Sequence, residues 1–343
     1  MEFVIRKACD RSRRRSCIRA IAWLGLSLGL IGSGAQAQQG PLELETRIPL
    51  GTVKGRIDHL AVDLGRKHLF VAELENNSLG IVDLNTASLL HRITNLKEPQ
   101  GVGYVPTVDI LFVANGGDGS LRLFRGGDFA ATGKIDLGKD ADNVRVDKDS
   151  KSVYVGHGAG ALAVIDASSH AKIKDIALPA HPESFQVTED MLKAFVNLPD
   201  AQSIGVIDTH AGRLSHSWPT GNDHGNFAMA LDDGGARAII VFRNPPKLSV
   251  RDMQTGTPVA ERNTCRDVDD VFFDAKRHRV YVTCGEGAID VFDAAANYAP
   301  MARIATRSGA RTSLFIAPLD RLALAVRASK TEPAAVWLYR PSP

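Results

Sequence analysis

Residues 280–293 read Val280-Tyr281-Val282-Thr283-Cys284-Gly285-Glu286-Gly287-Ala288-Ile289-Asp290-Val291-Phe292-Asp293. In this stretch two apolar segments, rich in β-branched and aromatic residues, flank a short turn that contains two glycines. The pattern is typical of two strands joined as a hairpin. Val153-Tyr154-Val155, followed by Val164-Ile165-Asp166, repeats it earlier in the chain. We therefore expect the hairpin to belong to a repeated unit.

The unit recurs seven times at a nearly constant period, with gaps of 42, 42, 41, 42, 44 and 43 residues between its opening apolar residues. Each unit has room for four short strands and lacks the 3.6-residue apolar period of a helix. Four antiparallel strands every ~42 residues are typical of a propeller blade. The sequence thus predicts an all-β fold, a single seven-bladed β-propeller with four-stranded antiparallel blades over residues 38–343. The opening residues are Leu60, Val102, Val144, Phe185, Phe227, Val271 and Leu314.

Aspartates recur at the end of the third strand in most units. An aspartate at the head of a turn accepts a hydrogen bond from its own backbone two residues on. We therefore interpret these residues as structural and not as catalytic. They are Asp83, Asp166, Asp208, Asp252 and Asp293.

The seventh unit lacks a fourth strand, because the chain ends at Pro343 after three. An unpaired strand at the edge of a sheet is prone to aggregation. A spare strand with alternating apolar and polar residues, Leu42–Ile48, precedes the first unit. We expect this N-terminal strand to complete the seventh blade and to close the ring.

The first 37 residues have the three parts of a secretory signal peptide. Seven Lys and Arg residues precede an apolar run from Ala20 to Gly32, and Ala35-Gln36-Ala37 forms a cleavage site. The run is shorter than the roughly 20 apolar residues that span a bilayer. We therefore expect cleavage after Ala37 and a periplasmic or secreted protein. Ser12-Arg13-Arg14 leaves twin-arginine export open beside the general secretory route.

Removal of residues 1–37 changes the charge of the protein. Lys plus Arg falls from 41 to 34 and Asp plus Glu from 39 to 37, so the formal charge goes from +2 to −3. Sequence-independent binding to phosphates needs clustered positive charge, so nucleic acid is not an expected partner. No second apolar stretch is long enough to span a bilayer, and we expect a monomer.

The repeats resemble the YVTN-type (YncE-like) β-propeller family over about residues 42–343. The strand pairs at 153–166 and 280–293 reproduce its motif, whereas Ala238-Ile239-Ile240 departs from it in the fifth unit. The resemblance implies an exported binding or accessory protein. Some propellers with similar repeats are lactonases or lyases, and lactonase-like propellers hold a divalent cation in the channel.

In a propeller, the loops before the first strand and after the second strand of each blade meet at one mouth of the central channel, where rigid strands position ligand-binding loops. Every unit places polar residues at these positions. We therefore predict a ligand site at this mouth. The candidate ligand-binding residues are Arg56, Asp58, His59, Asn143, Glu183, His224, Asp269, Arg243, Arg311 and Arg327.

Three kinds of chemistry suit this mouth. Oxygen ligands favour Ca²⁺ or Mg²⁺, histidines suit acid–base catalysis, and arginines bind carboxylates and phosphates. The Gly-x-Ser-x-Gly motif of nucleophilic hydrolases is absent from residues 38–343 and occurs only at Gly25–Gly29, inside the apolar run of the expected signal peptide. The candidate metal ligands are Glu73, Asn115, Asn197 and Asp269.

These observations favour binding over catalysis. We expect an exported binding or accessory propeller, with a small polar or anionic ligand or another exported protein as its partner. A metal-dependent lactonase or lyase at the same mouth is the first alternative, and a protein-interaction scaffold is the second.

Two cysteines remain in the expected mature chain, Cys265 and Cys284. An even cysteine number in an exported protein suggests a disulfide. A hairpin turn at residues 275–278 would place Asp269 opposite Cys284, and the preceding loop can fold back to bring Cys265 near. We therefore predict a Cys265–Cys284 disulfide, with two buried reduced thiols as the alternative.

Overall fold

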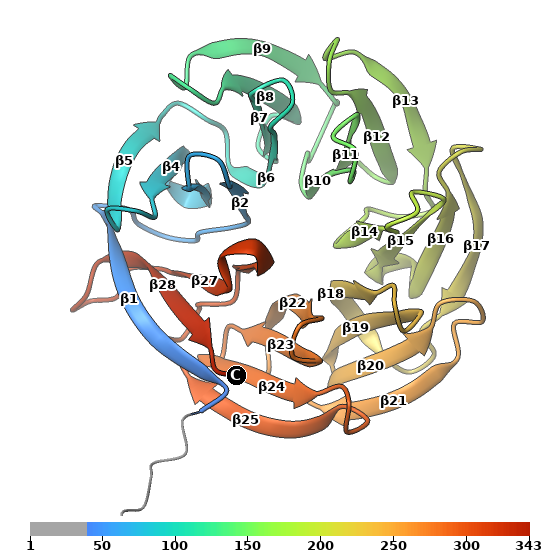
Figure 1. Cartoon of the computed structure of the whole chain (residues 1–343). Helices are drawn as coiled ribbons and strands as arrows, with labels where there is room; N and C mark the ends of the chain where they lie inside the picture. The colour runs from blue at the N-terminus through green and yellow to red at the C-terminus, as the bar shows by residue number, and fades with distance from the viewer. Residues whose placement is uncertain (1–39) are drawn as a thin grey trace, which may run out of the picture. The chain divides into compact units, whose positions relative to one another are not determined.

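The computed structural model describes residues 40–343, so the predicted signal peptide lies outside the described residues. These residues form seven four-stranded antiparallel sheets around a central channel (Figure 1). The predicted seven-bladed propeller is confirmed. In blades one to six the first strand lies beside the channel and the fourth lies at the rim.

The strands follow the chain order blade by blade. Blade one holds β2 (Leu60–Asp63), β3 (His68–Glu73), β4 (Ser78–Asp83) and β5 (Ser88–Ile93); blade two holds β6 (Pro99–Val105), β7 (Ile110–Asn115), β8 (Ser120–Arg125) and β9 (Ala131–Asp136); blade three holds β10 (Val144–Val146), β11 (Ser152–His157), β12 (Ala161–Asp166) and β13 (Lys172–Ala177). Blade four holds β14 (Phe185–Val187), β15 (Lys193–Leu198), β16 (Ser203–Asp208) and β17 (Arg213–Pro219); blade five holds β18 (His224–Asp232), β19 (Arg237–Asn244), β20 (Pro246–Asp252) and β21 (Pro258–Asn263); blade six holds β22 (Val268–Asp274), β23 (Arg279–Cys284), β24 (Ala288–Asp293) and β25 (Ala299–Ala305). Within residues 40–343, three short 3₁₀ helices lie in the connections: η1 (Leu74–Asn76), η2 (Pro199–Ala201) and η3 (Ala317–Leu319).

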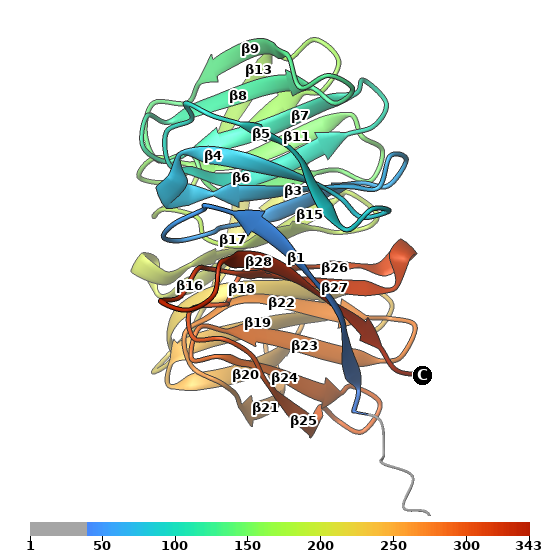
Figure 2. The same ribbon diagram turned by 90° about the vertical axis from the view of Figure 1, so that its left-hand side faces the viewer.

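Blade seven combines the two ends of the described chain. Its strand order is β1 (Leu42–Gly51), β28 (Ala334–Pro341), β27 (Arg321–Val326) and β26 (Ser313–Ile316). Strand β1 runs antiparallel to β28 on the outer side of the blade, with Leu42 opposite Pro341 and Gly51 opposite Ala334 (Figure 2). The N-terminal strand therefore closes the ring as predicted, and it extends three residues beyond the predicted Ile48.

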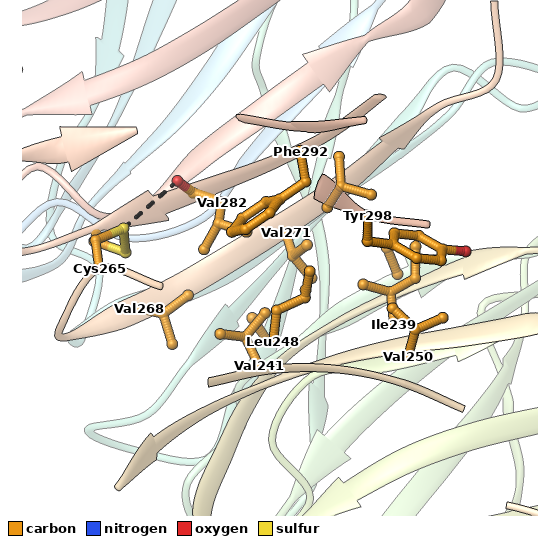
Figure 3. Packing of buried hydrophobic residues seen from close by; sticks show 14 of the residues in the cluster. Ile239, Val241, Leu248, Val250, Cys265, Val268, Val271, Val282, Phe292 and Tyr298 are labelled. Atoms are coloured by element: carbon orange, nitrogen blue, oxygen red, sulfur yellow. Dashed lines mark hydrogen bonds between the residues drawn. A yellow bond between two sulfur atoms is a disulfide. The ribbon is translucent and has the colours of Figure 1, made fainter. Parts of the chain in front are cut away.

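Neighbouring blades pack through their apolar faces. Between blades five and six, Ile239, Val241 and Val250 pack in one cluster with Val271 and Val282 (Figure 3). Burial of one such side chain contributes roughly 1.5–3 kcal/mol. Each blade thus depends on its two neighbours for part of its stability.

The recurring aspartates have the structural role that was predicted for them, because each one caps a turn. Oδ1 accepts a hydrogen bond from the backbone N–H two residues on at Asp83 (2.7 Å), Asp166 (3.1 Å), Asp252 (3.0 Å) and Asp293 (2.9 Å). At Asp208 the donor is three residues on, at 2.8 Å. These carboxylates stabilise the turn after the third strand.

A disulfide joins Cys265 to Cys284 at the start of blade six, with the two α-carbons 5.8 Å apart (Figure 3). Asp274 pairs with Arg279 as the hairpin analysis expected, but Cys284 lies opposite Val268 and not Asp269. The expected register was wrong by one residue because a bulge lies between Val268 and Asp270. The bulge directs Asp269 toward the channel mouth.

The oxidised state of this pair is a prediction that a thiol count can test. We expect denatured, unreduced protein that lacks residues 1–37 to contain no free thiol. The bridge spans 19 residues, so chain-entropy arguments give it roughly 3 kcal/mol of stabilisation. Two free thiols per chain would show that the pair is reduced in the purified protein.

Candidate functional site

A pocket of about 240 Å³ lies at one mouth of the channel, and all seven blades contribute to it. Its lining comes from the ends of the innermost strands, the loops before them and the end of β19. We call it the mouth pocket. It is lined by Arg56, Asp58, His59, Gln100, Asp140, Asp142, His181, Glu183, Phe227, Arg243, Asp269 and Arg311.

The mouth pocket borders a longer channel. His59 also lines a chamber of about 470 Å³ between the innermost strands, where Arg145 and Asp270 lie. That chamber shares Val62 and Tyr104 with a hollow of about 690 Å³ at the opposite end of the blades. The side chains around His59 therefore lie between the mouth pocket and the channel interior.

Seven of the ten candidate ligand-binding residues line the mouth pocket, and three do not. Asn143 is buried behind Asp142, and its Oδ1 has no hydrogen-bond partner among residues 40–343. His224 begins β18 and is exposed outside the pocket, and Arg327 is exposed just after β27. The seven that line it are Arg56, Asp58, His59, Glu183, Asp269, Arg243 and Arg311.

The arginines on one side of the pocket are paired with carboxylates. Asp269 Oδ1 lies 2.6 Å from Arg243 Nη2, and its Oδ2 lies 2.9 Å from Arg311 Nε. Arg311 also contacts Asp267 at 2.7 Å. Arg56 contacts Asp58 at 3.1 Å. These ion pairs neutralise the arginines that were expected to bind an anionic ligand.

Phe227 enters the pocket because β18 contains a bulge between Asn226 and Ala228. The guanidinium carbon of Arg243 lies 3.5 Å from the centre of the Phe227 ring. This stacking and the bond from Arg243 Nε to the Val268 carbonyl oxygen, 2.8 Å, hold the guanidinium in place. Arg243 is therefore a fixed wall of the pocket.

Blades three and four supply a second group of charged side chains. His181 Nδ1 lies 2.7 Å from the Gly158 carbonyl oxygen, and its Nε2 lies 4.0 Å from Asp142 Oδ2. Interaction with Asp142 raises the pKa of His181 to about 9. Burial and the Asp142 charge raise the pKa of Glu183 to about 7.

His59 lies between two buried carboxylates at the inner end of the pocket. Its Nε2 is 3.7 Å from Asp58 Oδ1, and its Nδ1 is 3.8 Å from Asp270 Oδ1. Burial raises the pKa of Asp58 to about 7 and that of Asp270 to about 6, although the His59 charge opposes both shifts. Burial opposes the charged form of His59, but Asp58 and Asp270 outweigh it and raise the His59 pKa.

Three of the four candidate metal ligands have structural partners away from the pocket. Glu73 is fully buried and forms an ion pair with Arg92 at 2.7 Å. The amides of Asn115 and Asn197 bond to backbone groups within and between blades. Asp269 alone lines the pocket. Within residues 40–343 no group of three or more His, Cys, Asp or Glu side chains is arranged to hold a metal ion.

Comparisons with known proteins support the fold and do not identify a family. No family model matches the chain, and no curated protein matches it. Among solved structures, hydrazine synthase from Kuenenia stuttgartiensis is similar, with a TM-score of 0.70 and 16% identity over 80% of this chain and 95% of that chain. At that identity the likeness shows a shared propeller fold. In the described part of this chain no helix is long and apolar enough to cross a bilayer.

From the raised pKa values in the pocket we predict that the free energy of unfolding falls as pH rises from about 5.5 to 8.5. The pKa values of Asp58 and Glu183 are raised, so the folded state holds protons that the unfolded state has lost, and this contribution disappears as pH passes about 7. The raised pKa of His181 acts in the same direction, because its contribution is full below about 6.5 and is lost toward 9. Carboxylates with lowered pKa values, such as Asp109, change the stability of the folded state only at lower pH, where they become protonated.

Thermal melts at the two pH values check this prediction. The melting temperature of the ligand-free protein is expected to be higher at pH 5.5, and the difference should shrink in an Asp58→Asn, Glu183→Gln variant. A double variant with an undiminished difference would assign the pH dependence to other groups.

Proposed function

We propose that this protein is an exported binding or accessory propeller whose ligand site is the mouth pocket. The observation that carries the proposal is the convergence of side chains from all seven blades on one cavity of about 240 Å³. Eleven of its twelve lining residues are polar or charged, and they stand on strand ends and on the loops that lead into the strands of the blades. Such a site suits a small polar ligand.

Three observations support export and the choice of partner. The signal-peptide pattern at residues 1–37 and the Cys265–Cys284 pair both suit an oxidising compartment. The resemblance of the repeats to YVTN-type propellers points to the periplasm or the exterior of the cell. The ligand is a small polar molecule, or a group presented by another exported protein that docks on the rim.

A binding screen with a blocked pocket tests the proposal. The panel contains small amines, carboxylates, zwitterionic amino acids and neutral polyols, and binding is read as a rise in melting temperature. Gln100→Trp places an uncharged indole in the pocket without changing the net charge. Gln254→Trp, at an exposed turn of blade five, is the matched control.

We expect at least one compound to stabilise the parent and Gln254→Trp but not Gln100→Trp. Compounds that stabilise all three proteins equally would place the site elsewhere. A panel without any stabilising compound would count against a small-molecule site at this mouth.

Acid–base catalysis at the same mouth is a second candidate, and one observation favours it. Asp58 is buried and the adjacent His59 is half-buried, and the Asp58 pKa of about 7 lies where a general acid or base is most effective. Hydrolysis of a lactone panel that is lost in Asp58→Asn would support this enzyme. Equal rates in the parent and the variant would exclude Asp58 as the catalytic group.

A further inference from the structure

We infer that the mouth pocket selects a small molecule carrying a protonated amine, with Asp142 and Glu183 as the acceptors of its N–H groups. The inference rests on the proposed function and adds the charge and the hydrogen-bonding character of the ligand. It reverses the anionic ligand that the sequence alone suggested. The reason lies in how charge is distributed around the pocket.

The two sides of the pocket differ in how their charges are paired. On the side formed by blades five, six and seven, both oxygens of Asp269 are held by arginines at 2.6 and 2.9 Å. On the side formed by blades three and four, the Glu183 carboxylate has no hydrogen-bond or ion-pair partner among residues 40–343, and the Asp142 carboxylate has the His181 imidazole as its one ion-pair partner there. Asp142 is only 8% exposed, and its closest cationic atom is His181 Nε2 at 4.0 Å.

Asp142 is buried and Glu183 is half-buried. A carboxylate in such a position has lost part of its hydration, and this is unfavourable where no close donor replaces the lost water. The raised pKa of Glu183 reflects this cost and the nearby Asp142 charge. An ammonium group supplies positive charge and three N–H donors at once. Bound between Asp142 and Glu183, it would satisfy both carboxylates.

The arginine side offers little to an anion. Arg243 and Arg311 are already engaged with Asp269, and Arg243 is further fixed by the Val268 carbonyl group. A carboxylate ligand would have to compete with Asp269 and would approach Asp142 and Glu183 as well. Electrostatic repulsion from these groups disfavours it.

The size of the pocket favours an organic cation over a bare metal ion. About 240 Å³ is far more than the roughly 10–15 Å³ that holds one water molecule. The remaining lining provides an amide at Gln100 and carboxylates at Asp58 and Asp140, which suit a second polar or ammonium group on such a molecule. A short aliphatic amine fits these features.

Calorimetric titration with four probes tests the inference: putrescine, succinate, butanediol and calcium chloride. Each probe is titrated into three proteins. The first is the parent, and the second is the double variant Asp142→Asn/Glu183→Gln, which we call the pocket variant. The third is a control with the same charge change at two exposed positions, Glu43→Gln/Asp200→Asn. Circular dichroism confirms that all three proteins are folded. We expect putrescine to bind the parent and the control, and at least tenfold more weakly to the pocket variant.

A pH series adds a second readout. Putrescine should bind the parent more tightly at about pH 8 than at about pH 5.5, because Glu183 loses its proton over this range. Asp58, whose pKa is also raised to about 7, lines the same pocket and loses its proton over the same range. The pocket variant should therefore lose the part of the pH dependence that Glu183 contributes and keep the part that Asp58 contributes. A purely structural role of the two carboxylates would not produce this loss.

The outcomes separate this inference from the proposed function. Succinate or calcium binding in place of putrescine would overturn the inference, as would putrescine binding that the pocket variant leaves unchanged or the absence of any binding. If succinate bound and Gln100→Trp blocked it, the mouth pocket would still be the ligand site and only the amine specificity would fail.

Discussion

Deletion of residues 38–50 is expected to lower the melting temperature by roughly 10 °C or more, or to leave the protein aggregated. The deletion removes nearly all of β1, which buries Leu42, Ile48 and Leu50 against blade seven and its neighbours. Three such side chains are worth roughly 5 kcal/mol or more, a large part of the typical 5–15 kcal/mol of a folded protein. The loss also exposes the edge of β28.

Single substitutions in β1 keep the closure testable if the deletion variant does not fold. Ile48→Ala removes a fully buried side chain and should cost about 2–5 kcal/mol in urea unfolding. Leu44→Ala, at a position 37% exposed in the same strand, is the control and should cost less than about 1 kcal/mol. A deletion variant that melts like the parent, or equal costs for the two substitutions, would show that β1 does not hold the ring closed.

The fold could be predicted from the sequence because it depends on local patterns that repeat along the chain. Alternation and turn residues around Val153-Tyr154-Val155 predict a strand pair anywhere, and seven copies at one period leave few architectures. Ring closure followed from counting strands. The mouth positions of Asp58, Glu183 and Asp269 followed from the same register, because equivalent loops of all blades meet at one end of the channel.

The ion pairs between side chains of different blades could not be predicted from the sequence, because they depend on side-chain directions that no local pattern encodes. Asp269 meets Arg243 and Arg311 from two other blades, and only the folded ring brings the three together. The bulges beside Asp269 and Phe227 change which residues point into the channel. Gly225 lies two residues before Phe227, but no glycine lies within β22 to mark the bulge at Asp269. His181 was missed although it precedes the candidate Glu183 by two residues in the same loop, and that position was the available signal.

The sharing of Asp269 by two arginines leads to the second large expected effect. In Asp269→Asn the side chain keeps its shape and loses its charge, so Arg243 and Arg311 remain partly buried without their common partner. Breaking a fully buried pair costs about 3–5 kcal/mol, and exposed pairs are worth about 0–1 kcal/mol. The two arginine side chains are 24% and 22% exposed, so we expect a loss of about 2 kcal/mol in urea unfolding.

Asp267→Asn is the matched control, because Asp267 lies two residues before Asp269 at the start of β22, pairs with Arg311 alone and has a side chain that is 45% exposed. Its cost should stay within about 0.5 kcal/mol. Release of the two arginines should also change selectivity, so that succinate binds Asp269→Asn more tightly than the parent. Equal stability of the two variants, together with unchanged succinate binding, would mean that Asp269 does not set the charge of this side of the pocket. A loss of stability with a gain of succinate binding would instead identify Asp269 as the residue that reserves the mouth pocket for ligands other than anions.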